Sequence, residues 1–166
     1  TLEEGRGDPA VPLYVTYNEE TLEVISKETK LERVPVVTNF RYDKLDHIAT
    51  EEWLTDSSLQ VADTPQPLLD KRDELTFLYR LSRHLKAGRE EVRGKPENFN
   101  RPDYNFRLQG NGDNVPDGSE TVQITVRKRG APLDLIVAEA AIVANSSWGQ
   151  LLADYGVPGI YRSQAS

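Results

Sequence analysis

Apolar and polar residues alternate near the start of the chain. From Val11 to Tyr17 every second residue is apolar, which is the period of a strand with one buried face. A polar turn at residues 18–20 leads into a second extended run that continues to Val34 and on to Phe40. Two extended runs joined by a short polar turn predict an antiparallel hairpin.

The same alternation returns in the second half of the chain. Residues 104–108 and 122–126 both place an apolar side chain at every second position. The stretch between them, residues 111–118, is polar and contains glycine, asparagine and proline, so it can bury little. This arrangement predicts a second hairpin with a long tip.

Helical spacing appears between the two hairpins. Thr50 precedes two glutamates, and its hydroxyl can cap a short helix whose first turn favours acidic residues. After a loop at residues 57–67, leucines recur about every 3.5 positions from Leu68 to Leu85, which predicts an amphipathic helix. We expect this helix to end near Gly88 or at Gly94.

The last predicted helix is more apolar than the others. Pro132 suits the first turn of a helix, and residues 133–152 are rich in alanine, leucine, isoleucine and valine on more than one face. We expect a buried core helix, interrupted or bent near residues 145–149. The order of elements predicts an α+β fold in which antiparallel strands and hairpins pack with two to three helices, the last largely buried. Residues 1–166 are expected to form a single unit.

Composition limits the chemistry that is available. The chain has no cysteine, which excludes disulfides and cysteine-based metal sites. It also has no methionine, so we expect it to begin inside a longer gene product. No unbroken apolar run approaches about 18 residues, so we expect no membrane span and a cytoplasmic location. The net charge of −7 argues against nucleic-acid binding, since polyphosphate requires concentrated positive charge.

That average hides a basic stretch. Residues 1–70 carry a net charge of −9, residues 71–107 carry +4, and residues 108–166 carry −2. Guanidinium groups can clamp phosphates and an exposed aromatic ring can stack on an unpaired base, so the stretch fits a single-stranded nucleic acid. An ordinary solvated helix face is the alternative. The residues concerned are Arg72, Arg80, Arg83, Arg89, Arg93, Lys95, Phe99, Arg101, Tyr104 and Arg107.

Candidates for catalysis are few. Asp43, His47 and Glu51 follow one another at intervals of four, so one helical face could offer three metal ligands, but a solvated acidic face explains the same pattern. The other histidine, His84, lies between basic residues of the predicted amphipathic helix. Neither histidine belongs to a recognisable nucleophile motif.

Three segments together resemble a known family. Residues 100–108 (NRPDYNFRL), residues 136–145 (IVAEAAIVAN) and residues 159–162 (GIYR) are similar, in order and approximate spacing, to motifs of the RNB catalytic domain of ribonuclease II-type exoribonucleases. Residues 36–54 are also similar to a strand-then-helix passage of that domain. The resemblance implies a processive 3′→5′ hydrolysis of single-stranded RNA to nucleoside 5′-monophosphates. It also implies Mg²⁺ in the parent enzyme, held by an aspartate cluster that this chain lacks.

The resemblance assigns roles to individual positions. Phe99 lies close to a family aromatic that stacks on terminal bases, and Glu139 matches the second acid of a paired Glu-Glu whose first position is Ala138 here. Glu139 is therefore a weak catalytic candidate. Arg83, Arg89, Phe99 and Arg101 are the candidate RNA-binding residues, while Tyr104 and Asn145 match motif positions expected to be structural, as a packed ring and a helix-capping amide.

The chain is thus interpreted as a middle segment of an RNB domain that is not a competent nuclease by itself. The expected partners are single-stranded RNA and the remainder of the parent polypeptide. A fragment of this kind should leave a large apolar surface uncovered, especially on the helix over residues 133–152. Two rivals remain open: a non-catalytic RNA-binding or protein-interaction module on the same scaffold, and a small α+β protein with an unrelated enzymatic role.

Overall fold

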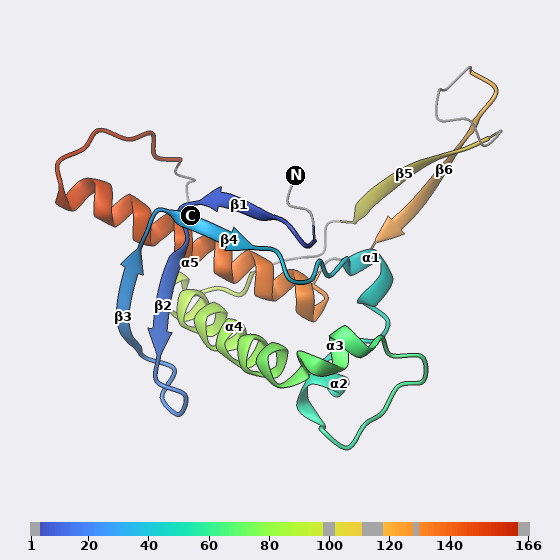
Figure 1. The fold of residues 1–166 in the computed structure, drawn as a ribbon, viewed down its shortest axis with the longest axis horizontal. Helices are drawn as coiled ribbons and strands as arrows, with labels where there is room; N and C mark the ends of the chain where they lie inside the picture. The colour runs from blue at the N-terminus through green and yellow to red at the C-terminus, as the bar shows by residue number, and fades with distance from the viewer. Residues whose placement is uncertain (1–3, 98–101, 111–117, 128–129, 163–166) are drawn as a thin grey trace.

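The chain adopts an α+β fold in the computed structural model, which describes residues 4–97, 102–110, 118–127 and 130–162 (Figure 1). The described strands form three separate antiparallel pairs, β1 with β4, β2 with β3 and β5 with β6. The predicted fold class is therefore confirmed. The strands are β1 (Gly7–Ala10), β2 (Leu13–Tyr17), β3 (Val24–Thr29), β4 (Glu32–Pro35), β5 (Asp103–Gln109) and β6 (Thr121–Arg127).

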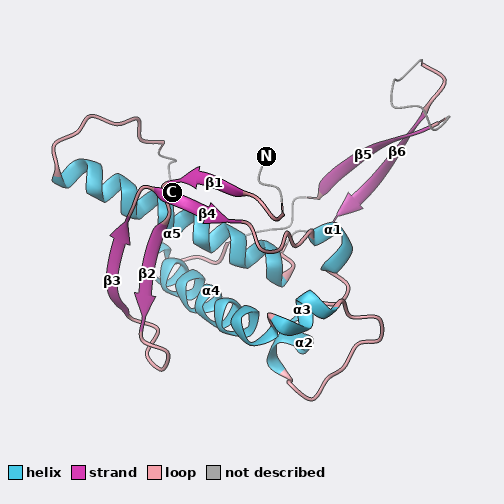
Figure 2. Ribbon diagram, viewed as in Figure 1, coloured by secondary structure: helices cyan, strands magenta, loops and turns pink. Residues whose placement is uncertain are grey.

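Two long helices lie side by side at the centre of the molecule, with three shorter helical segments at one end (Figure 2). The prediction of two to three helices counted too few, because the short segments lack a sustained helical period. The helices are α1 (Tyr42–Leu45), α2 (Glu51–Thr55), α3 (Gln66–Asp70), α4 (Arg72–Arg93) and α5 (Pro132–Asp154).

The first predicted hairpin is present as β2 and β3. Their register runs from Leu13 opposite Thr29 to Tyr17 opposite Val24. The turn between them is held by the Asn18 side chain, whose Oδ1 accepts from the amides of residues 20 and 21 at 2.8 and 2.9 Å. The second extended run does not continue as one strand: its last part forms β4, which pairs with β1. The hairpin is therefore bracketed by a second strand pair.

Local signals account for most helix ends. The Thr50 hydroxyl accepts from the Trp53 amide at 3.2 Å, which confirms the predicted cap. The leucine-rich helix is split at Lys71 into α3 and α4, and α4 continues to Gly94, whose φ of 72° is the left-handed conformation that glycine favours.

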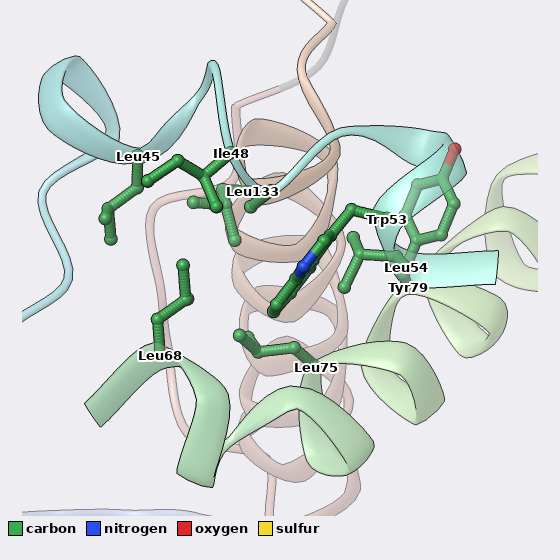
Figure 3. Packing of buried hydrophobic residues seen from close by; sticks show 9 residues of the cluster. Leu45, Ile48, Trp53, Leu54, Leu68, Leu75, Tyr79 and Leu133 are labelled. Atoms are coloured by element: carbon green, nitrogen blue, oxygen red, sulfur yellow. The ribbon is translucent and has the colours of Figure 1, made fainter. Parts of the chain in front are cut away.

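The hydrophobic core lies where the short helices meet the start of α4 and the first turn of α5. Trp53 and Leu68 are fully buried at its centre, and Leu54 is 2% exposed (Figure 3). Leu133 is the contribution of α5 to this cluster. The remaining members are Leu45, Ile48, Ala49, Leu75 and Tyr79.

The prediction that the last helix is largely buried is wrong. Only Leu133 and Glu139 of α5 are buried, while Val137 is 69% exposed. The reason is that α4 covers one side of a helix that is apolar on several sides. The predicted interruption is also absent, because α5 is continuous through residues 145–149 and the Ser146 hydroxyl donates to the Ile142 carbonyl at 2.7 Å.

Within the described residues, α5 is long and apolar enough to cross a membrane by length and composition alone. The absence of an unbroken apolar run therefore does not exclude a membrane. A long apolar core helix passes the same test, and Glu139, in the first half of α5, is paired with an arginine of α4. The absence of a membrane partner remains a prediction.

The second hairpin is present and projects from the body of the molecule (Figure 1). Its register places Tyr104 opposite Val126 and Phe106 opposite Ile124, with Leu108 and Val122 paired beyond them. These six side chains share one face of the ribbon, and each is at least 52% exposed. The hairpin thus has a fully uncovered apolar face.

Candidate nucleic-acid interface

The basic stretch of the sequence lies mainly on α4. The helix has acidic residues in its first turn and Arg93 in its last turn, as the helix dipole favours. Its cationic side chains do not share one face, because their spacing distributes them around the helix. They are Arg72, Arg80, Arg83, Lys86, Arg89 and Arg93.

Two of these arginines hold neighbouring elements. The Arg72 guanidinium donates to the Trp53 carbonyl at 2.6 Å and to the Asp56 carbonyl at 2.7 Å, and it stacks 4.4 Å from the centre of the Trp53 ring. Arg80 donates to the Glu19 carbonyl at 2.5 Å, in the turn between β2 and β3. Both groups fasten other elements to α4, so they are poorly placed to bind phosphate.

Arg83 is the more accessible of the two RNA-binding candidates that the structure describes. Its Nη1 lies 2.8 Å from Glu51 Oε1, and both side chains are more than half exposed. Exposed ion pairs are weak, about 0 to 1 kcal/mol, so a phosphate can compete with the carboxylate. The Arg83 guanidinium lies 5.8 Å from the centre of the Tyr79 ring, whose hydroxyl has a pKa raised by burial.

Arg89 is committed to the contact between α4 and α5. It forms an ion pair with Glu139, which is 2% exposed, and its Nη2 also lies 3.3 Å from Glu97. The hydrogen bond to Glu139 raises the pKa of the Arg89 guanidinium. Arg93 also forms an ion pair with Glu97, with its Nη2 3.4 Å from Glu97 Oε1. Glu139, the weak catalytic candidate, therefore has its carboxylate paired with an arginine and shielded from solvent.

The other candidates are dispersed. Phe99 and Arg101 lie outside the described residues. Tyr104 is 52% exposed on the apolar face of β5–β6 and is not packed against a core. Asn145 is an exposed residue in the middle of α5, so its amide does not cap the helix. The structure brings Arg89 and Glu139 together and leaves Arg83, Tyr104 and Asn145 on separate elements.

A shallow groove on the C-terminal half of α4 combines apolar and cationic groups. It has a volume of about 550 Å³, and Val92, one of its lining residues, is 91% exposed. Two rows at intervals of four build it, residues 84, 88 and 92 beside residues 85, 89 and 93, and Gly88, which has no side chain, leaves a dip within the first row. The groove was missed from the sequence, although this spacing could have indicated it. An exposed apolar side chain beside cationic groups can accept both a base and a phosphate.

The side chains that the structure describes do not form a site that fits magnesium. Among those residues no three histidine, aspartate or glutamate side chains lie close enough together to hold a metal ion. The side chain of Asp43 lies outside the described residues. The single helical face suggested for Asp43, His47 and Glu51 is absent, because α1 ends at Leu45 and a new helix begins at Glu51.

Comparison with known proteins gives one match. The family model described as "RNB domain" matches residues 1–166. No curated protein matches the chain, and no solved structure matches it.

Proposed function

The chain belongs to the RNB domain family of exoribonuclease-type nucleases, and on that premise we propose that it is a segment of a 3′→5′ exoribonuclease. The parent enzyme would hydrolyse single-stranded RNA and release nucleoside 5′-monophosphates. The observation that carries this proposal is the match of the family model over residues 1–166.

The segment's own contribution is to hold RNA. The α4 groove supports this role, because Arg93 and the exposed apolar side chain of Val92 both line it. Arg83, with its weak exposed ion pair, lies on the same helix and adds a second cation. The two guanidinium groups lie at different positions along and around α4, so each offers a separate phosphate contact. Arg89 acts indirectly by fixing α5 against α4.

The hydrolytic centre belongs to other parts of the parent protein. Magnesium in that centre would activate water and stabilise the leaving oxygen, but the described side chains include no group that could hold it. Glu139 is paired with Arg89 and inaccessible, so it serves as a positioning residue for the two helices. We place the enzyme in the cytoplasm, as a soluble protein that acts on RNA.

The remainder of the parent polypeptide would cover the uncovered apolar surfaces. The β5–β6 ribbon exposes six paired apolar side chains, and a two-stranded ribbon is only marginally stable by itself in water. The helix α5 also exposes Val137. Soluble monomers rarely expose contiguous apolar patches larger than a few hundred Å². Further segments of the same polypeptide are therefore the proposed partner.

The test compares the 166-residue chain with its parent protein. Each is incubated with end-labelled single-stranded RNA and magnesium, and the products are resolved by chromatography. We expect the chain to bind the RNA and leave it intact, and the parent to release nucleoside 5′-monophosphates from the 3′ end. Metal-dependent release of nucleotides by the isolated chain would show that the catalytic centre lies within the chain, against this proposal.

A non-catalytic RNA-binding or protein-interaction module is the second candidate function. The burial of Glu139 and its ion pair with Arg89 favour it, because the helix that resembles the family's acidic motif offers no accessible carboxylate at this position. The same experiment separates the two functions. A parent protein that binds RNA without shortening it, at any magnesium concentration, would establish the module.

A further inference from the structure

The chain doubles back on α5 after the helix ends. Gly156 adopts a φ of +63°, and the Val157 amide donates to the Leu152 carbonyl at 2.8 Å, which reverses the direction of the chain (Figure 1). Residues 157–162 then approach the helix closely. A Cβ atom on Gly159 would lie 3.3 Å from Leu152 and 3.5 Å from Tyr161, so a larger residue would crowd this contact.

Tyr161 is held in place by this return. Its hydroxyl donates to the Gly149 carbonyl at 3.1 Å. The ring lies close to the helix there, because a Cβ atom on Gly149 would be 3.5 Å from Tyr161 Cε1. The residue is nevertheless 61% exposed. One part of the ring is thus fixed against α5 and the rest is open, which makes a stacking surface that loses little conformational entropy on binding.

A cleft of about 710 Å³ lies between α5 and the returning segment. Tyr161 and Arg162 line one side, and Asn145 and Trp148 line the other. The indole of Trp148 donates to Thr29 Oγ1 of β3 at 3.4 Å, which ties it to a second element. The cleft therefore combines two aromatic rings, an amide and a guanidinium. This is a small apolar site with a few convergent polar groups, as ligand sites commonly are.

We propose that this cleft binds one nucleotide of a single-stranded RNA. The cleft is then a second RNA contact on this chain, and this inference rests on the proposed function. The base stacks on the open part of the Tyr161 ring, as bases do on exposed aromatics in single-strand binding proteins. The Asn145 amide can both donate to and accept from a base edge. The Arg162 guanidinium binds the adjoining phosphate.

Trp148 provides a local signal for the test. Trp53, the other tryptophan, is fully buried in the core, so a ligand in the cleft should change only the emission of Trp148. The 166-residue chain is titrated with a fluorescently labelled oligoadenylate, and with an abasic oligomer of the same length that keeps the phosphates. Label anisotropy reports binding anywhere on the chain, and tryptophan emission, followed with the unlabelled oligomers, reports the cleft. We expect oligoadenylate to change the tryptophan emission and the abasic oligomer to leave it unchanged.

Variants locate the contact. Tyr161→Ala should weaken oligoadenylate binding about tenfold, the effect of one lost stacking contact, whereas Tyr161→Phe keeps the ring and should lose about threefold or less. Tyr155→Ala is the matched control, because Tyr155 is 77% exposed and lies outside the lining of the cleft. It should bind like the unaltered chain. Trp148→Phe should abolish the emission change, which assigns that signal to the tryptophan in the cleft.

The outcomes separate this inference from the proposed function. Binding seen by anisotropy with no change in tryptophan emission would place the RNA elsewhere, overturning the cleft and leaving the proposed function intact. Equal effects of the abasic oligomer, or of Tyr155→Ala and Tyr161→Ala, would also overturn the cleft. If neither oligomer binds by anisotropy, both the cleft and the RNA-holding role of the segment are wrong.

Discussion

Arg89 of α4 and Glu139 of α5 form an ion pair at the contact between the two long helices, and they differ sharply in accessibility. The Glu139 side chain is 2% exposed, while the Arg89 side chain is 27% exposed and also reaches Glu97. Removing one partner therefore has unequal consequences. Without Arg89 a carboxylate stays buried with its charge unpaired, whereas without Glu139 the guanidinium keeps a carboxylate and some water.

This asymmetry predicts an order of stabilities. Arg89→Leu should lower the free energy of unfolding by about 3 kcal/mol, because an uncompensated buried charge is costly. Glu139→Leu should cost about 1 kcal/mol, and the double variant should approach the unaltered chain, since apolar side chains can replace a buried pair. Urea-induced unfolding measures all three. Arg83→Leu, at the exposed pair with Glu51, is the control and should cost at most about 1 kcal/mol. Equal losses for the first two variants would contradict the argument.

A second prediction concerns acid pH at the end of α4. The Glu90 carboxylate accepts from the Glu97 amide at 2.7 Å and pairs with Lys86 at 3.1 Å. These contacts, the amide first, lower the pKa of Glu90 below its ordinary value of 4.5. A carboxylate with a lowered pKa in the folded state stabilises it above the unfolded-state value, and this contribution is lost as the pH falls through the folded-state pKa.

The measurement is the chemical shift of the Glu97 amide proton. It should stay constant at neutral pH and move with a midpoint below pH 4.5, as Glu90 takes up a proton. Glu90→Gln should remove that movement, while Glu91→Gln, at the neighbouring exposed position, should leave it in place. A midpoint at or above the ordinary value would show that the amide does not hold the carboxylate in solution.

The described part of the fold was predictable where the signal is local. The Thr50 cap and the β5–β6 pairing follow from neighbouring residues and from a two-residue period. The pairing of β1 with β4 was not predictable, because β1 is four residues long, contains Gly7 and Pro9, and pairs with a strand far along the chain. The break at Lys71 was missed since no glycine or proline marks it. For α5, composition revealed the apolar surface and could not reveal how little of it α4 covers.

The candidate site, too, was predictable only in part. Charge counting located the arginines of α4, yet it could not assign their partners, which are set by the fold. Arg72 binds main-chain carbonyls of the segment around α2, and Arg89 meets Glu139 fifty residues away. A basic stretch therefore predicted a surface for RNA where much of the charge serves to join elements. The spacing that forms the α4 groove was present in the sequence, but only the exposure of Val92 identifies it as a surface.

A third prediction tests RNA binding by α4. Arg83→Gln and Arg93→Gln should each weaken binding of single-stranded RNA several-fold at low salt, because each removes one phosphate contact. Each should also reduce the slope of log affinity against log salt by about 0.7. Lys71→Gln is the matched loss of charge at the opposite end of the helix and should change neither quantity. Anisotropy titrations at several salt concentrations give both numbers. An unchanged slope in both arginine variants would place the RNA away from α4.

The last prediction concerns the apolar face of the β5–β6 ribbon. Phe106 and Ile124 are paired across the ribbon at its centre and are 67% and 58% exposed. In the 166-residue chain this face should bind the dye anilinonaphthalene sulfonate, and Phe106→Lys should reduce the dye fluorescence, since it places a charge within the patch. Asn105→Lys, on the opposite face of the same strand, should leave the dye fluorescence unchanged.

If the parent protein covers this face, the same two variants should differ in their effect on the stability of the parent. There Phe106→Lys would bury a charge that has no partner and should lower the melting temperature by several degrees, whereas Asn105→Lys should have little effect. Calorimetry of the two parent variants measures this difference. If the parent tolerates both lysines equally, its other segments do not pack on the ribbon, and the partner of this face is not the remainder of the polypeptide.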